Sequence, residues 1–267
     1  MKAANAEKLA YWVLFACFLT FGCGGGEKKE EGAAASKEET AAETTANDQP
    51  TGPVGTIVGT VTFDGEVPKL KILNMDAEPA CAAKHTEPVR SQALVLGDGN
   101  TLANVFVKIK SGLPEKKWAP PSEPVVLDQN GCIYDPHVFA VMVGQPLKIL
   151  NSDGILHNIH PIPKINRSFN FAMPKTVKEA VRKFKKVEEE PFPIKCDVHP
   201  WMLAYMAVMS HPFYSVTGKD GKFTIENVPE GNYELEAWHE KLGTLTAPVN
   251  VSANETVTVE FVFKRSN

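Results

Sequence analysis

The chain has 267 residues, of which 43% are hydrophobic and 22% are charged, with 20 prolines and 19 glycines. Its formal net charge of −4 argues against a nucleic-acid-binding protein, because such binding requires a strong basic excess. No apolar run reaches about 18 residues, the length of a membrane-spanning helix, so a protein with several membrane spans is excluded.

The N-terminal 22 residues have the layout of an export signal. Two lysines precede an apolar run at 11–21, and a glycine-rich stretch around Cys23 follows. The sequence Thr-Phe-Gly-Cys resembles a bacterial lipobox, which would make Cys23 the lipid-bearing residue; the alternative is an ordinary cleaved signal. Residues 23–52 are too polar to form a core and are predicted to be a disordered tether. We expect an exported protein, in the periplasm or at the cell surface, held to the membrane by a lipid anchor.

The rest of the chain has the pattern of β-structure. Short runs rich in β-branched and aromatic residues alternate with clusters of Gly, Pro, Asn and Asp, which predicts an all-β fold of sandwiches or Greek-key barrels. The predicted strands lie at 56–63, 93–96, 105–110, 125–127, 138–143, 147–150, 223–225, 233–238 and 256–263. Hairpin turns are predicted at 97–100, 129–131, 218–221 and 229–232. The stretch 177–184 fits either a helix or an irregular loop and strand.

One short loop carries three residues that suit a metal. Residues 196–202 read Cys-Asp-Val-His-Pro-Trp-Met, and they place Cys196, His199 and Met202 close together. A thiolate, an imidazole and a thioether suit copper, whereas methionine is a poor zinc ligand. A trigonal copper site needs a second imidazole, and His157 is the candidate. The alternatives are a zinc site, or an inert buried thiol with two core histidines.

Residues of about 124–210 resemble the cupredoxin family of blue copper proteins. The stretch GQPLKILNSDGILHN ending in His157-Asn158, and the loop from Cys196 to Met202, carry the resemblance. It implies a Greek-key sandwich with one type 1 copper. His157, Cys196 and His199 would be the strong ligands, Met202 the long axial ligand, and Asn158 the residue that ties the two ligand loops together. The chain departs from the family in a long basic segment at 160–195 and in its β-rich flanks.

The resemblance implies a one-electron carrier and not an enzyme, because four protein ligands leave no open position for a substrate. In the family the loop histidine faces solvent, so His199 would be the electron port, with Pro200 and Trp201 as a docking patch. The expected partner is a redox protein such as a cytochrome c. The alternative function is a metal-free surface β-sandwich that binds carbohydrate or protein.

Two further cysteines form a predicted disulfide. With Cys196 assigned to the metal, Cys81 and Cys132 are the remaining pair in a compartment that permits disulfides. The alternative is two buried free thiols. The lysines and arginines of the 160–195 segment form either a solvated face or a steering patch for an acidic redox partner.

The flanks suggest a second sandwich. DGKFTIENVPEGNYELEAW at 220–238 resembles a carboxypeptidase-regulatory-like β-sandwich. The predicted organisation is a lipoprotein signal at 1–22, a tether at 23–52, an N-terminal β region at 53–118, a copper domain at 119–213 and a C-terminal β region at 214–267. The sequence leaves open whether the two β regions belong to one sandwich.

Overall fold

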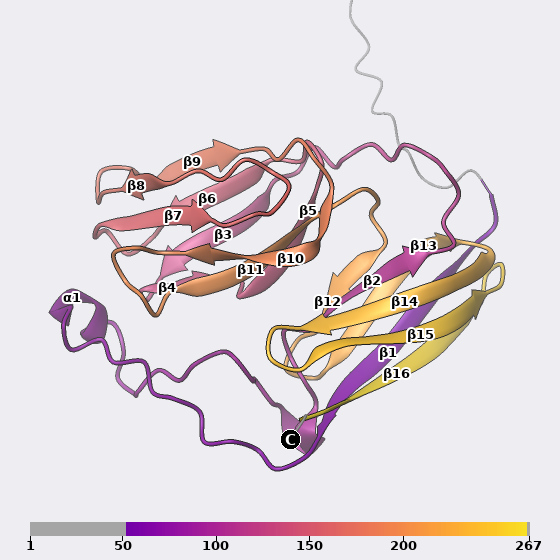
Figure 1. The fold of residues 1–267 in the computed structure, drawn as a ribbon, viewed down its shortest axis with the longest axis horizontal. Helices are drawn as coiled ribbons and strands as arrows, with labels where there is room; N and C mark the ends of the chain where they lie inside the picture. Colours follow the sequence, from indigo (N-terminus) through magenta and orange to yellow (C-terminus); the bar gives the residue numbers. More distant parts are fainter. Residues whose placement is uncertain (1–51, 266–267) are drawn as a thin grey trace, which may run out of the picture. The chain divides into compact units, whose positions relative to one another are not determined.

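A computed structural model describes residues 52–265 (Figure 1). The predicted signal, Cys23 and nearly all of the tether lie outside the described residues. The all-β prediction is confirmed, since the described residues form sixteen strands and only two short helices, α1 (Pro79–Ala82) and the 3-10 helix η1 (Asp98–Asn100). Neither helix is long and apolar enough to cross a membrane.

The first and last strands form one β-sandwich, here named the flanking sandwich. One sheet has the order β13-β1-β16 and the other β12-β2-β14-β15. The strands are β1 (Val54–Asp64), β2 (Phe106–Ser111), β12 (Tyr214–Val216), β13 (Lys222–Pro229), β14 (Gly231–His239), β15 (Gly243–Val251) and β16 (Thr256–Lys264). β1 runs parallel to β16, and β2 runs antiparallel to β14. The N-terminal and C-terminal β segments therefore share both sheets.

Strand β1 shows how the sequence builds this core. Its residues alternate between buried and partly exposed positions, with Ile57, Val61 and Phe63 facing inward, as a period of two requires. Gly59 occupies the same inward face. A Cβ atom at this position would lie 2.3 Å from the ring of Phe223, so the absence of a side chain lets that ring pack across the strand.

The middle of the chain forms a second sandwich, here named the central sandwich. Its sheets have the orders β5-β11-β10-β7-β8 and β4-β3-β6-β9. The strands are β3 (Val125–Asn130), β4 (Ile133–Asp135), β5 (Val138–Met142), β6 (Leu147–Asn151), β7 (His157–Pro161), β8 (Phe171–Met173), β9 (Glu179–Arg182), β10 (Glu188–Lys195) and β11 (Leu203–Met209). Two sandwiches of this kind are consistent with the predicted cupredoxin-like sandwich and its second β-sandwich.

The segment from 72 to 90 departs from the expected organisation. It lies within the N-terminal β region, yet Met75 and Cys81 belong to the hydrophobic core of the central sandwich. Cys81 is joined to Cys132 by a disulfide, which confirms the predicted pair. The N-terminal region thus contributes to both cores, because β1 and β2 pair with the flanking strands while the loop between them packs elsewhere.

Several predicted elements differ in the structure. Residues 93–96 form no strand and carry one isolated bridge, between Leu96 and Leu102. The turns at 218–221 and 229–232 join strands of opposite sheets, and only 129–131 connects two paired strands, β3 and β4. A local turn signal fixes a change of direction but not the sheet in which the next strand pairs. The ambiguous stretch at 177–184 contains β9 and no helix.

Candidate metal centre

Strand pairing brings the two ligand segments together. His157 is the first residue of β7, and Cys196 follows the last residue of β10, which pairs with β7. The loop from Cys196 to Met202 then turns back into β11, the antiparallel neighbour of β10. Within it, the Cys196 N–H donates to the Met202 carbonyl (3.3 Å) and the Met202 N–H donates to the His199 carbonyl (2.9 Å). These bonds fix a tight loop at the end of the sheet.

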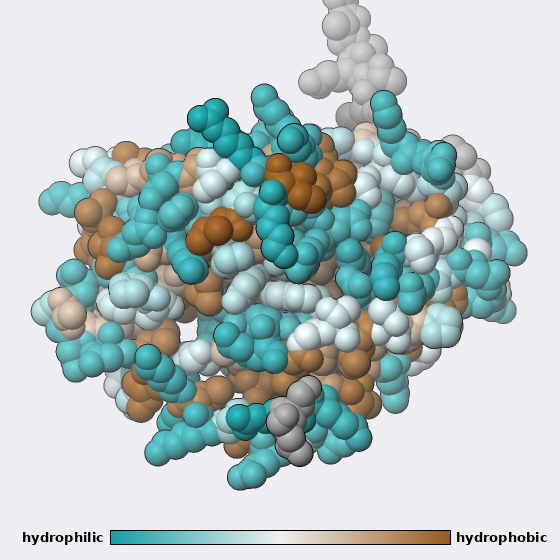
Figure 2. Space-filling model, in the orientation of Figure 1, coloured by the Kyte–Doolittle hydropathy of each residue, from teal (hydrophilic) through white to brown (hydrophobic). Residues whose placement is uncertain are grey.

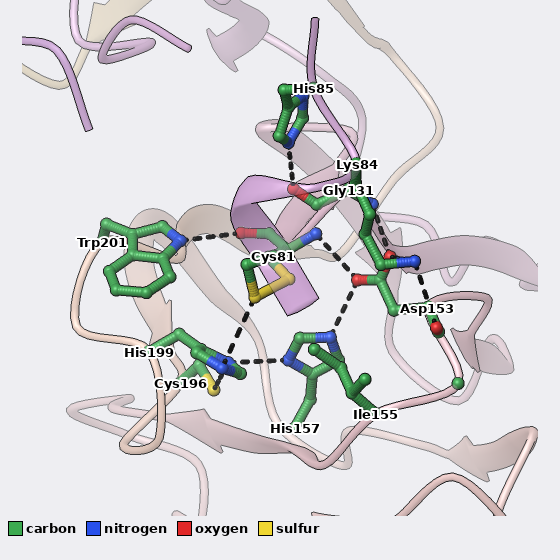
Figure 3. Close-up of a disulfide and its surroundings, with 12 residues drawn as sticks. Cys81, Lys84, His85, Gly131, Asp153, Ile155, His157, Cys196, His199 and Trp201 are labelled. Carbon is green, nitrogen blue, oxygen red and sulfur yellow. Dashed lines mark hydrogen bonds and ion pairs between the residues drawn. A yellow bond between two sulfur atoms is a disulfide. The ribbon is translucent and has the colours of Figure 1, made fainter. Parts of the chain in front are cut away.

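Three predicted ligands converge on one point (Figure 3). The Nδ1 atoms of His157 and His199 lie 2.9 Å apart, and the Cys196 Sγ lies 3.7 Å from the His199 Nδ1. Metal bonds to nitrogen and sulfur of about 2.0–2.3 Å allow ligand atoms to be up to about 4.6 Å apart, so both separations fit a shared ion. All three side chains are buried, with exposures of 0%, 2% and 2% for His157, Cys196 and His199.

The surroundings favour a Cys196 thiolate and a neutral His199 ring. Burial disfavours a charged Cys196, but hydrogen bonds from His157 and from nearby backbone groups outweigh it and lower the pKa of Cys196. Burial, together with the charge of His157, lowers the pKa of His199 and keeps that ring neutral. Burial also opposes a charge on His157, but its hydrogen bond to Asp153 outweighs this and raises the pKa of His157. Metal ligands must be deprotonated, so Cys196 and His199 favour the ligating state, whereas His157 would release a proton when a metal binds.

Asp153 orients His157 and was not identified as a site residue from the sequence. Its buried carboxylate accepts from the His157 Nε2 (2.8 Å), the Gly131 N–H (2.7 Å), the Cys132 N–H (2.8 Å) and the Lys84 Nζ (3.1 Å). Burial disfavours the charge, but these four donors lower the pKa of Asp153 to about 2. Because the carboxylate binds Nε2, the Nδ1 atom of His157 is left for a metal. The Asp-Gly turn before His157 was the available signal.

Asn158 links the two ligand segments. Its side-chain oxygen accepts from the Asp197 N–H (2.6 Å), and its amide donates to Asn170 (2.7 Å) and Asp197 (3.3 Å). Tyr134 adds a second link, because its hydroxyl donates to the carbonyl oxygens of Asn158 and Lys195. Residues adjacent to both His157 and Cys196 are thus held from two sides.

The expected exposure of His199 is wrong. His199 is 2% exposed, and the Nε2 edge of its ring lies 3.7 Å from the Cys81 Sγ, so the disulfide covers this edge (Figure 3). Trp201 packs beside the ring at 5.2 Å between centroids and donates its indole N–H to the Cys132 carbonyl (3.0 Å). Of the predicted docking residues, Pro200 is exposed and Trp201 is half-buried.

Met202 and His160, the two remaining candidate ligands, are placed differently from the three converging residues. Met202 is 1% exposed and lies in the ligand loop, with the backbone bonds given above. His160 bonds the carboxylate of Asp197 at 3.0 Å. Within residues 52–265, the only other group of potential ligands comprises Cys132, Asp153 and His157, and Cys132 cannot supply a thiolate because it is in the disulfide.

Comparisons with known proteins extend over parts of the chain. Residues 209–259 match a family model described as polysaccharide lyase family 4, domain II, which covers too little of the chain to assign it to that family. The carboxypeptidase-regulatory-like character of the flanks stays a prediction. No curated protein matches the chain.

Similar solved structures include two cupredoxins and a copper enzyme. A reduced mutant of amicyanin is 20% identical, with a TM-score of 0.29, over 39% of this chain and 98% of amicyanin. A purple cupredoxin from Nitrosopumilus maritimus is 25% identical, with a TM-score of 0.24, over 29% of this chain and 82% of its own. The copper-containing nitrite reductase from Thermus scotoductus is 20% identical, with a TM-score of 0.29. The match covers 38% of this chain and only 26% of that enzyme. At these TM-scores the matches decide nothing alone, and the metal centre depends on the side-chain geometry.

Proposed function

We propose that this chain is an exported copper protein that carries single electrons. One copper ion would be held by His157, Cys196 and His199, with Met202 as a weak axial ligand. The observation that carries the proposal is the convergence of two imidazole Nδ1 atoms and one thiol sulfur in a buried cluster. Two imidazoles, one thiolate and a distant methionine form the donor set of blue copper sites.

The residues of the chain prepare this site for electron transfer. Bound copper would supply the one-electron change between its Cu(I) and Cu(II) states. Asp153 holds the His157 ring with its Nδ1 toward the ligand cluster, and Asn158 holds the loop that carries Cys196. Burial of all three ligands excludes water. Because Asp153 and Asn158 hold the ligand residues in place, these residues would move little when the copper changes oxidation state.

An electron carrier accounts for the donor set better than an enzyme does. With four protein ligands the ion would have no open position for a substrate, unlike a catalytic metal centre. The partner would be another redox protein of the periplasm or cell surface, such as a cytochrome c. Since the disulfide covers the Nε2 edge of His199, the partner would approach through Trp201, which contacts both His199 and Cys132. The membrane attachment through Cys23 is part of the same proposal.

A metal-free module that binds carbohydrate or protein is the second candidate. The match of residues 209–259 to a polysaccharide lyase domain favours it for the flanking sandwich. This function would leave the buried thiol and its two imidazoles unused, so we place it second.

Copper titration separates the two candidates. We expect the purified chain to bind one equivalent of Cu(II) with an intense visible band, and to lose that band in Cys196→Ser and His157→Gln. His160→Gln is the matched control, because His160 lies three residues away but bonds Asp197 and not the cluster. A colourless protein with glycan affinity would instead support the binding module.

A further inference from the structure

A cavity opens at the edge of the central sandwich. Residues 166–170, before β8, and 182–186, from the last residue of β9 onward, line a cavity of about 700 Å³. β8 is the edge strand of one sheet and β9 is the edge strand of the other, so the cavity lies where the two sheets end. A volume of this size is typical of small-molecule sites, which occupy about 300–1,000 Å³.

Stacked aromatic rings form one wall. The half-buried Phe169 stacks on Phe171, with 5.7 Å between centroids and 27° between planes, and it also packs against Phe184 at 5.9 Å. Phe184 is 3% exposed and in turn contacts Phe192 in the core. The row of rings therefore leads from the cavity into the sandwich and is held by core packing. Such a wall offers a preformed surface to a planar apolar group.

The rest of the lining is cationic. Arg182 places its guanidinium 4.3 Å from the ring centre of Phe171, and within the described part of the chain its one hydrogen bond is to the Val181 carbonyl. Its other N–H groups are therefore available to an anion. Four further cations line the cavity without an ion pair among residues 52–265, and they are Arg167, Lys183, Lys185 and Lys186.

The carboxylates near this positive charge lie outside the lining of the cavity. No aspartate or glutamate lines the cavity. Glu188 is buried and accepts from the backbone N–H groups of Lys164 and Asn166, and Glu190 pairs with Lys164. Over the β8–β9 region, Figure 2 shows hydrophilic and hydrophobic side chains next to one another. A solvated face would explain the lysines, but not their gathering around a cavity with an aromatic wall.

We propose that this cavity binds a small organic anion that contains a planar ring. The ring would lie against Phe169 and Phe184, and a carboxylate, sulfate or phosphate group would face Arg182 and the lysines. Planar guanidinium groups bind such oxyanions in bidentate fashion. We favour a small molecule over an acidic peptide because the site is a cavity whose wall is aromatic.

The cavity lies beside the candidate metal centre. Asn170 lines it and donates to the Asp197 carboxylate (2.6 Å), while its side-chain oxygen accepts from Asn158 (2.7 Å). Asp197 and Asn158 are the neighbours of Cys196 and His157 in the chain. A bound anion would thus lie next to Asn170, which bonds residues adjacent to His157 and Cys196. The binding proposal itself requires no copper.

Calorimetric titration of the metal-free full chain with naphthalene-2-sulfonate tests the site. We expect saturable binding that weakens at least about tenfold in Arg182→Gln, because a charge-assisted bond is lost, and in Phe169→Ala, because ring contact is lost. Lys175→Gln is the matched control, since it removes a positive charge from the same segment outside the lining, and binding should stay within about twofold. Neutral 2-naphthol and inorganic sulfate should each bind at least about tenfold more weakly than the probe.

The wild-type chain gives a second readout that does not depend on how the variants fold. Nuclear Overhauser contacts between the naphthalene protons and the Phe169 ring should appear in the complex. Their absence would overturn the proposal, as would sulfonate binding unaffected by Arg182→Gln in a folded variant. Tighter binding of a hexaglutamate peptide than of the sulfonate would also overturn it, in favour of an acidic protein partner. Because copper is absent throughout, none of these outcomes bears on the electron-carrier proposal.

Discussion

Replacing Asp153 with asparagine removes a negative charge from the buried network behind His157. The carboxylate now accepts from four donors, namely His157, Lys84 and the backbone N–H groups of Gly131 and Cys132. An amide keeps one accepting oxygen and turns an NH₂ group toward donors, so about half of these bonds are lost. Each charged hydrogen bond contributes about 1.5–3 kcal/mol. Lys84 is 29% exposed, so its ammonium can bond water once the carboxylate is gone. We therefore expect the free energy of unfolding to fall by about 3 kcal/mol.

The depressed pKa of Asp153 gives an independent scale for this loss. A fall from 3.8 to about 2 corresponds to about 2 kcal/mol of stability at neutral pH. Because the pKa is lower in the folded state, this contribution is present above about pH 4 and disappears as the pH falls through about 2. The two figures agree within about 1 kcal/mol.

Thermal unfolding and copper titration measure the consequences. For a chain of this size, about 3 kcal/mol lowers the Tm of the metal-free Asp153→Asn variant by roughly 6–12 °C. Copper affinity should fall about 10–100-fold, because the His157 ring is no longer held in one orientation. Glu190→Gln is the matched control, since its ion pair with Lys164 is exposed and contributes little. A variant that keeps its Tm and binds copper within about threefold of wild type would refute the role given to Asp153.

Three further predictions concern the cover of the site and the flanking sandwich. The Cys81–Cys132 disulfide joins residues 51 positions apart, so its reduction should lower the free energy of unfolding by about 4 kcal/mol. Calorimetry measures this loss, and thiol counting shows that reduction is complete. An unchanged Tm after complete reduction would contradict the prediction. Trp201→Phe should leave the copper spectrum unchanged and slow electron transfer to a partner in stopped-flow measurements, whereas an equal rate would exclude Trp201 as the route. Burial lowers the pKa of His239 to about 4, so stability should be full above about pH 6.5 and fall by about 3 kcal/mol as the pH drops toward 4. Urea unfolding at pH 7 and pH 4.5 measures this, and His239→Gln should flatten the difference.

The sequence by itself determined the fold class and identified the candidate ligands. Cys196, His199 and Met202 lie within seven residues, so they come close together when those residues form a tight loop. Alternating apolar runs separated by turn residues specify strands, because the side-chain period of a strand is two. These signals are local, so they could be read along the chain.

The tertiary structure alone decided what surrounds the candidate ligands. The disulfide over His199 joins residues 51 positions apart, and nothing local shows that the 72–90 segment packs on the central sandwich and not on the flanking one. The four donors around Asp153 come from three separate segments, and the ring-and-cation cavity forms only where two sheet edges meet. Contacts of this kind depend on how strands pair across long loops, and turn residues do not encode that choice.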